Sequence, residues 1–417
     1  MAIVIIALVA LEQDAPRALV RATLAIGAAV LAYAAFGLLN GAILSDAFVN
    51  LRGPVRVLAA ASAVAYLCSK SIPSTLRTLL RALSFVSVCT AAVVAGIAFF
   101  GIGGFDIRSG NAAMYTSSSS IVYDATRVTP DSGLACVTLS GVLIVAWLLW
   151  DSRPLGSRTI TVIIIVCGLF IGLISYTRGH LLVLGVVLVG ATILRIGDLS
   201  FIVRALGMLT AIVVGGAAVL MSVKYAFPSI FAPIENAMSA FSGRVLSGLS
   251  ASTAAADTST QWRVRESALA LQYFRDNWLF GSGLGVRYRS PMRGEIFTGT
   301  RGLTYIHSAY LWILVKLGIV GAVALLIGLF VFVKRLFVRR DDFVGALSKM
   351  ILLVTIGYLV QMITSPTPFE SGNSVVVGLI VGLGLACTST KFPGFSQDVT
   401  GGRRPISPVY SSEMGKA

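Results

Sequence analysis

A histidine that stands where a long polar segment meets an apolar helix is the residue best suited to chemistry in this chain. His307 lies in the stretch Thr304–Gly321, TYIHSAYLWILVKLGIVG, and is one of only two histidines. An imidazole at a lipid–water boundary can take up or release a proton near neutral pH. The alternative is an interfacial histidine that accompanies the aromatic belt residues of a membrane helix.

A second candidate is an arginine in a very short turn. Between the apolar runs 159–175 and 180–194 there is room only for the turn 176–179, which contains Arg178. A charged residue at the end of two membrane helices is costly unless it serves a function or reaches into the lipid headgroups. Arg178 is therefore either a ligand-binding residue or a snorkelling one.

The long polar segment 222–306 carries nine basic and five acidic residues. Its arginines suit an anionic ligand such as a lipid diphosphate, which a guanidinium can bind with two parallel hydrogen bonds. A solvated loop attracted to anionic headgroups is the alternative. The site candidates in it are Arg263 and Arg265, followed by Arg287, Arg289, Arg301 and Tyr305.

Within this segment, 261–280 reads QWRVRESALALQYFRDNWLF and predicts an amphipathic helix along the membrane surface or over a cavity. Its apolar face is predicted to hold Ala268, Leu269, Leu271 and Phe274. The glycines of GSGLG at 281–285 follow no strand, so they predict a tight turn rather than a dinucleotide-binding loop.

The composition indicates what kind of protein carries these residues. Hydrophobic residues make up 56% and charged residues 12%, which places most of the chain in a bilayer. The net charge of +15 is explained by the positive-inside rule, so nucleic acid is not expected as a partner. The five cysteines lie in or beside apolar runs without metal-type spacing, and we expect neither disulfides nor a metal site.

Ten apolar runs are long enough to span a membrane or nearly so, and 1–11 is a possible further half-span. They are 18–39, 54–69, 82–103, 134–150, 159–175, 180–194, 199–221, 308–333, 343–363 and 373–389. The basic cluster Lys334–Arg340 places its loop in the cytoplasm, and alternation places 222–306 and Arg178 on the outer face.

Three outer-face features, in this order, resemble the O-antigen ligase and O-antigen polymerase superfamily of membrane glycosyltransferases. They are SYTRGHLL at 175–182, an arginine before an amphipathic helix and GxG at 263–285, and HSAYLWILVKLGIVG at 307–321. TPDSGLA at 129–135 is similar to a further family element, and the resemblance covers about residues 100–325. The chain departs from the family pattern at Thr177, Trp278 and Ser308, where the family usually has Ser, Pro and Asn.

The resemblance implies an all-α polytopic protein of the bacterial inner membrane, with about 10–12 transmembrane helices and an active site facing the periplasm. Its domains would be an N-terminal transmembrane bundle (1–221), a periplasmic loop with amphipathic helix segments (222–306), C-terminal transmembrane helices (307–390) and a disordered cytoplasmic tail (391–417).

Family members transfer a glycan from undecaprenyl diphosphate and need no nucleotide sugar. His307 matches the family histidine, and Arg178 and Arg263 match its outward arginines, with Arg265 two residues from Arg263. The expected activity is that of a metal-independent ligase without cofactor, which uses a lipid A–core acceptor. A polymerase of lipid-linked repeats is the alternative. A flippase for lipid-linked glycans, which is a transporter and not a glycosyltransferase, is the less favoured third possibility.

Overall fold

The computed structural model describes residues 15–100, 108–110, 113–116, 119–124, 127–130, 132–150, 157–194, 199–226, 228–242, 258–290, 301–337, 343–366, 369 and 371–388. Each of the ten predicted apolar runs falls on a helix. These helices are α2 (Ala15–Leu39), α3 (Leu44–Lys70), α4 (Ile72–Phe100), α5 (Gly133–Trp150), α6 (Arg158–Ile174), α7 (Arg178–Ile193), α8 (Leu199–Ala226), α13 (Ala309–Leu336), α14 (Phe343–Gln361) and α15 (Ser371–Thr388). The prediction of an all-α polytopic membrane protein is confirmed, while the run 1–11 and the tail 391–417 lie outside the described residues.

Length and composition separate these helices into two groups. Among the described residues, α3, α4, α13 and α14 are both long enough and apolar enough to cross a bilayer. Apolar stretches of α2, α5, α6, α7 and α15 are shorter. A bilayer core of about 30 Å requires about 20 helical residues, so the shorter stretches would span only with polar ends at the interface.

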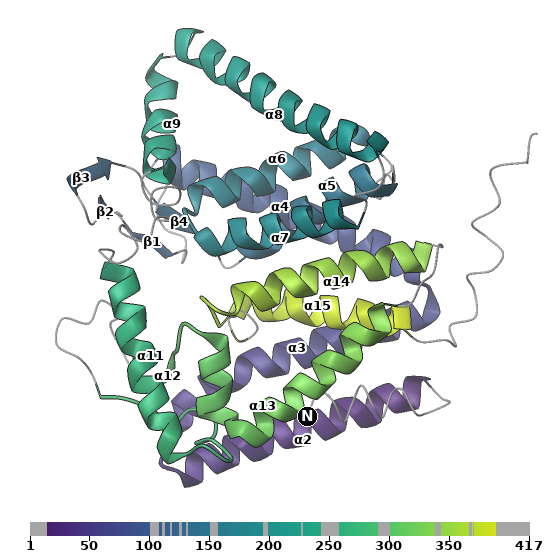
Figure 1. Ribbon diagram of the computed structural model, residues 1–417, viewed down its shortest axis with the longest axis vertical. Coiled ribbons are helices and arrows are strands. Elements are labelled where there is room, and N and C mark those ends of the chain that lie inside the picture. The colour runs from purple at the N-terminus through teal and green to yellow at the C-terminus, as the bar shows by residue number, and fades with distance from the viewer. Residues whose placement is uncertain are drawn as a thin grey trace, which may run out of the picture.

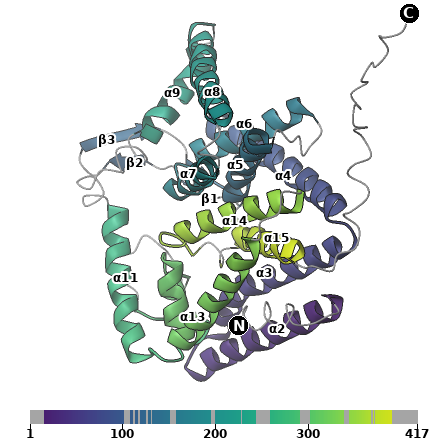
Figure 2. The same ribbon diagram turned by 45° about the vertical axis from the view of Figure 1, so that its right-hand side comes forward.

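The long helices lie side by side, whereas two helices of the polar segment run across one end of the bundle. Figures 1 and 2 show α9 (Pro228–Phe241) and α11 (Thr258–Asp276) at this end, with the short helix α12 (Arg301–Thr304) between α11 and the bundle. At this end α11 contacts α13, and α9 contacts α6 and α8. This end carries every predicted site residue that the structure describes.

Small residues allow the tightest helix contact, which joins α3 and α15. A Cβ atom added to Gly378 would lie 2.6 Å from the Val57 carbonyl oxygen, and one added to Gly382 would lie 2.6 Å from the Ala61 carbonyl oxygen. Only glycine permits backbones to approach so closely. The four-residue spacing of this glycine pair predicts close helix packing from the sequence alone, and the prediction is confirmed.

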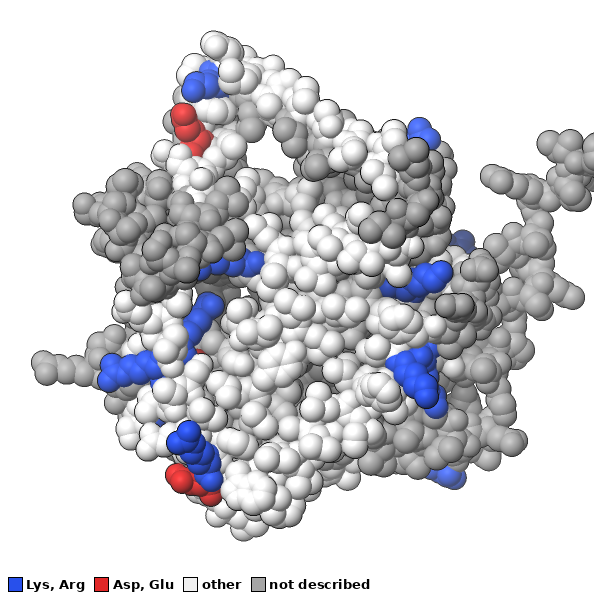
Figure 3. Space-filling model, in the orientation of Figure 1, with Lys and Arg blue, Asp and Glu red and all other residues white. Residues whose placement is uncertain are grey.

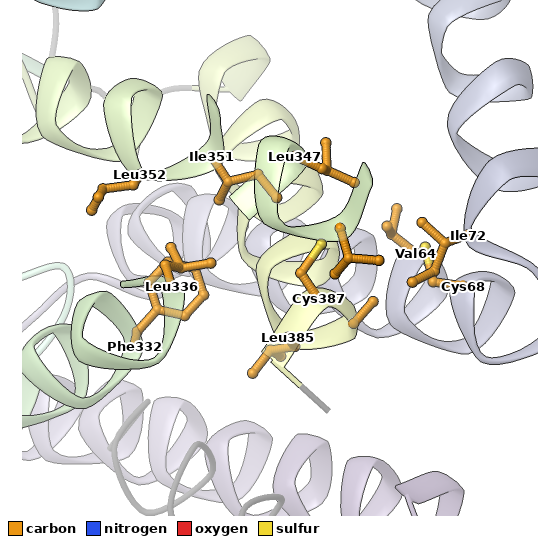
Figure 4. Packing of buried hydrophobic residues seen from close by; sticks show 12 residues of the cluster. Val64, Cys68, Ile72, Phe332, Leu336, Leu347, Ile351, Leu352, Leu385 and Cys387 are labelled. Carbon is orange, nitrogen blue, oxygen red and sulfur yellow. The ribbon is translucent and has the colours of Figure 1, made fainter. Parts of the chain in front are cut away.

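An apolar cluster holds the C-terminal helices to α3 and α4. Figure 4 shows its side chains, among them Cys68, Ile72, Leu336, Ile351 and Cys387, which come from α3, α4, α13, α14 and α15. The two cysteines are buried there as small apolar groups, and all five cysteines of the chain are free. Such a cluster fixes the helices that carry the site at their other end.

Basic residues also gather at the end of the bundle opposite α11. Arg77, Arg81 and Arg158 lie near the first turns of α4 and α6, and Lys334 and Arg335 lie in the last turn of α13. Figure 3 shows Lys and Arg atoms at this edge and again beside α11. The basic residues at the end opposite α11 agree in position with the side that the positive-inside rule predicts to be cytoplasmic.

The polar stretch 104–133 between two apolar runs predicts a loop from the sequence, and this prediction was wrong. This segment contains β1 (Arg108–Gly110), β2 (Ala113–Thr116), β3 (Ser119–Asp124) and β4 (Arg127–Thr129). β1 pairs with β4 and β2 pairs with β3, both antiparallel. The run SIVYD favours a strand because β-branched and aromatic residues fit a pleated ribbon, a local preference that the serine-rich context obscured.

Candidate functional site

His307 lies between α12 and α13, just before the cap of a membrane helix. Ser308 caps α13, because its hydroxyl accepts a hydrogen bond from the Leu311 backbone N–H at 3.4 Å. Serine and asparagine are about equally good capping residues, so a cap at this position is compatible with either. The cap fixes the chain direction at the helix mouth and thereby the position of the preceding imidazole.

A buried carboxylate holds this imidazole. One oxygen of Glu266, Oε2, accepts hydrogen bonds from the His307 backbone N–H and from its ring Nδ1, each at 2.8 Å. The side chain of Glu266 is 2% exposed and that of His307 is 15% exposed. A carboxylate can only accept, so Nδ1 carries the hydrogen and Nε2 is the basic ring nitrogen. The ring of Tyr305 packs edge-on against the imidazole, with centroids 4.9 Å apart.

The sequence of α11 explains why this glutamate points inward. The inward residues of the helix recur at helical spacing and include Trp262, Glu266, Ala270 and Phe274. The predicted apolar face was wrong in part, since Ala268 and Leu271 are exposed. The signal that could have found Glu266 is its spacing of four residues from both Trp262 and Ala270, which places a lone acid on an otherwise apolar stripe.

The two candidate arginines of α11, Arg263 and Arg265, are both exposed, but they differ in direction. Successive residues turn by about 100° around a helix, so Arg263 is about 60° from Glu266 and Arg265 about 100°. Arg263 therefore shares more of the face that carries the buried carboxylate. The sequence left the choice between these arginines open, and the helix geometry favours Arg263.

Arg178 and His307 approach the same place, the end of α14. Arg178 is the first residue of α7, and a Cβ atom added to the next residue, Gly179, would lie 3.0 Å from Gln361 Nε2. The Ala309 backbone N–H donates to the Met362 carbonyl at 2.9 Å. The starts of α7 and α13 therefore both contact the C-terminal end of α14, and this brings the arginine turn to the side of the histidine.

An open cavity of about 480 Å³ follows the turn after α11. It is lined by Arg287, Tyr288, Arg289, Ser290 and Leu303. The Tyr288 hydroxyl donates to the Tyr305 carbonyl at 3.1 Å and accepts from Arg289 Nε at 3.2 Å. Burial, followed by the negative charge of Glu266, raises the pKa of the Tyr288 phenol. The phenol thus stays protonated and links the cavity to the residues beside His307.

The predicted turn at GSGLG is confirmed, and it attaches α11 to α13. Gly281, Gly283 and Gly285 all have positive φ, as has Gly318, which breaks α13. The backbone N–H groups of Ser282 and Gly283 donate to the carbonyls of Val315 and Lys316 at 2.9 and 3.0 Å. The kink leaves these carbonyls available to the turn, and the resulting contact sets the distance between Glu266 and His307.

Two charged residues reinforce the segment after the turn. Asp46, in the first turn of α3, accepts a hydrogen bond from Arg287 Nε at 2.8 Å. Lys316, fully buried in α13, donates to the Val286 carbonyl. The side chain of Arg301 lies outside the described residues, and across the part of the chain that is described no group of three His, Cys, Asp or Glu could hold a metal ion.

Most of the residues of this site lie in a segment that matches a known protein family. A family model described as O-Antigen ligase matches residues 163–326, from α6 to the middle of α13. The matched segment contains Arg178, Arg263, Glu266 and His307, and it ends before α14. A search of curated proteins found none that matches the chain.

Proposed function

Since its segment 163–326 belongs to the O-antigen ligase family, we propose that this membrane protein transfers a glycan from undecaprenyl diphosphate to the lipid A–core oligosaccharide at the periplasmic face of the inner membrane. The observation that carries the proposal is the buried Glu266–His307 pair beside an arginine-lined cavity. Family membership supports a glycosyltransferase-like membrane enzyme with lipid-linked glycan substrates. The acceptor, the donor lipid and the residue roles are our inference.

In the proposed reaction, a hydroxyl oxygen of the acceptor attacks the anomeric carbon of the donor glycan. His307 Nε2 takes the hydroxyl proton while the bond between the anomeric carbon and the diphosphate oxygen breaks. Glu266 keeps the ring oriented and stabilises the imidazolium that forms, as the carboxylate does in other histidine–carboxylate pairs. The lipid diphosphate leaves with the bonding electrons, so the transfer needs neither a nucleotide nor a redox cofactor.

The arginines stabilise the leaving group in this proposal. Arg178 and Arg263 bind the diphosphate oxygens and neutralise the charge that develops there, and Arg265 contributes from the neighbouring face of α11. Electrostatic stabilisation of this kind is usually the largest catalytic contribution. Guanidinium groups can also supply the charge that a divalent metal supplies in other diphosphate chemistry, and on this ground we propose a metal-independent enzyme.

The decisive test is the activity of the purified His307→Ala protein. We expect transfer to fall by about 10²–10⁴-fold, because a positioned general base contributes about that much. The protein should stay folded, with a somewhat lower unfolding temperature, because Glu266 loses one of its two hydrogen bonds from His307. Ser308→Asn is the matched control, since it preserves the α13 cap, and it should retain activity. Full transfer by folded His307→Ala would contradict the role of the base.

The product of the same assay distinguishes the alternatives. Glycan attached to lipid A–core identifies a ligase, whereas a longer glycan still attached to undecaprenyl diphosphate identifies a polymerase. Movement of lipid-linked glycan across liposomes without any transfer would instead show a flippase. The cationic outer face favours the ligase slightly, because the ligase acceptor is an anionic glycolipid.

A further inference from the structure

The cavity lined by Arg287, Tyr288, Arg289, Ser290 and Leu303 has a defined relation to His307. Tyr288 joins the two, because its backbone N–H donates to Leu303 and its hydroxyl donates to the carbonyl of Tyr305, the residue whose ring packs on the imidazole. The cavity is therefore connected to the candidate base through Tyr288 and Tyr305, whereas none of its lining residues belongs to the arginine turn of α7.

Arg178 begins α7, which lies across α14 from the elements that carry the cavity. Figure 1 shows α7 on one side of α14, and α3, α12 and α13 on the other. Arg178 begins α7, whereas the cavity residue Arg287 is held to α3. A glycosyl transfer brings a donor diphosphate and an acceptor hydroxyl to opposite sides of one carbon, with the base on the acceptor side. Arg178 and the cavity likewise belong to opposite sides of α14, whose C-terminal end contacts the start of α13 beside His307.

The lining of the cavity indicates the chemistry of its ligand. It has two guanidinium groups, a buried phenol and a serine, and none of these five lining residues is acidic. Polar and aromatic groups suit a sugar, and guanidinium groups suit a phosphate or carboxylate on it. A volume of about 480 Å³ is within the range of small-molecule sites.

Both guanidinium groups are held in place before any ligand binds. Arg287 is fixed by Asp46, which is 4% exposed, through the 2.8 Å contact. Arg289 lies over the ring of Trp262, 5.6 Å from its centroid, and donates to the Tyr288 hydroxyl. Prior ordering of side chains lowers the entropy lost on binding, which is a property of binding sites rather than of solvated loops.

We infer that this cavity binds an anionic sugar of the acceptor glycolipid, and that Arg289 selects acceptors by their phosphate or carboxylate group. The inference rests on the proposed function for the direction of transfer, and it assigns the cavity to the acceptor rather than to the donor diphosphate. Asp46 acts as a positioning residue, because it holds Arg287 at the cavity wall without lining the cavity itself.

The test compares Arg289→Gln with Arg275→Gln in the full-length protein. Arg275 is exposed in the last turn of α11 and lies outside the proposed site, so the same change there is the matched control. Each protein is assayed with lipid A–core that is either intact or treated with phosphatase, at saturating donor. We expect Arg289→Gln to raise the KM for intact acceptor roughly tenfold and to leave the KM for donor unchanged, the loss expected for one charge-assisted hydrogen bond. Phosphatase treatment should raise the KM of the wild type similarly and add little to that of the variant.

A binding measurement without donor separates this inference from the proposed function. Radiolabelled intact acceptor should bind the Arg289→Gln protein roughly tenfold more weakly than the wild type or the Arg275→Gln control. If the wild type transfers no glycan, the proposed function fails, and binding still decides whether the cavity is an acceptor site. A rise in the KM for donor instead, or equal acceptor affinities in the two variants, would overturn the inference.

Discussion

Replacing Glu266 by glutamine tests the central pair with the least disturbance to the fold. Glutamine keeps the side-chain volume and one oxygen that can accept from both His307 donors, but it removes the charge. A neutral hydrogen bond contributes about 1 kcal/mol, and a charge-assisted one is roughly twice as strong. With two bonds to one oxygen, the change removes about 2 kcal/mol, or about 30-fold if the loss falls on the transition state.

The assay is the initial rate of glycan transfer by purified protein, with kcat and KM measured separately. We expect kcat to fall about 30-fold or more and both KM values to stay unchanged, because Glu266 acts through the ring and not on the substrate. Glu235→Gln is the matched control, since Glu235 is 57% exposed and 3.6 Å from Lys224, a surface pair of little energetic value. Wild-type kcat in a Glu266→Gln protein with an unchanged unfolding temperature would refute the orienting role.

Three further outcomes are expected. Arg178→Lys should lower kcat roughly tenfold or more, because a point charge loses the two-pronged contact with the diphosphate, and an unchanged rate would show that the residue does not bind it. Gly318→Ala should lower the free energy of unfolding by about 3 kcal/mol, since φ is +66° and the added Cβ would lie 2.4 Å from Gly281 N and Leu279 O. Gly185→Ala is the control: its added Cβ meets nothing within 4 Å, and it should not lower the free energy of unfolding. EDTA should leave transfer unaffected in a gel-resolved assay, and an activity that Mg²⁺ restores would contradict metal independence.

The membrane helices could be predicted from the sequence because hydrocarbon imposes one strong rule on them. Each span must satisfy its own backbone and expose apolar side chains, so hydropathy alone locates it. No such rule applies to the segment 104–133, where weak local preferences formed strands in place of the expected loop. The positions of the membrane helices could thus be predicted because the surrounding hydrocarbon determines them. The strands of 104–133 could not be predicted in this way, because they depend on pairing between short segments.

The candidate site was predictable in part for a related reason. His307 and Arg178 are conspicuous because polar residues at the ends of apolar runs are costly. Glu266 was counted only as one acid among the charges of a basic loop, since neither spacing nor composition connects it to a histidine 41 residues later. The connection depends on the turn at Gly281–Gly285 and the break at Gly318, which dock α11 on α13. Tertiary contacts of this kind have no periodic signal.

The docking of α11 also bears on why a carboxylate is buried at this position. An isolated buried carboxylate is strongly unfavourable, and Glu266 receives two hydrogen bonds on one oxygen from His307. A neutral imidazole compensates the charge only in part, whereas an imidazolium compensates it fully. When His307 takes the hydroxyl proton in the proposed reaction, the carboxylate stabilises the positive charge that develops on the ring, and this lowers the barrier to proton removal. Burial of Glu266 raises the free energy of the resting protein, but it strengthens the stabilisation of the imidazolium in the transition state. We therefore expect replacement of Glu266 to lower kcat.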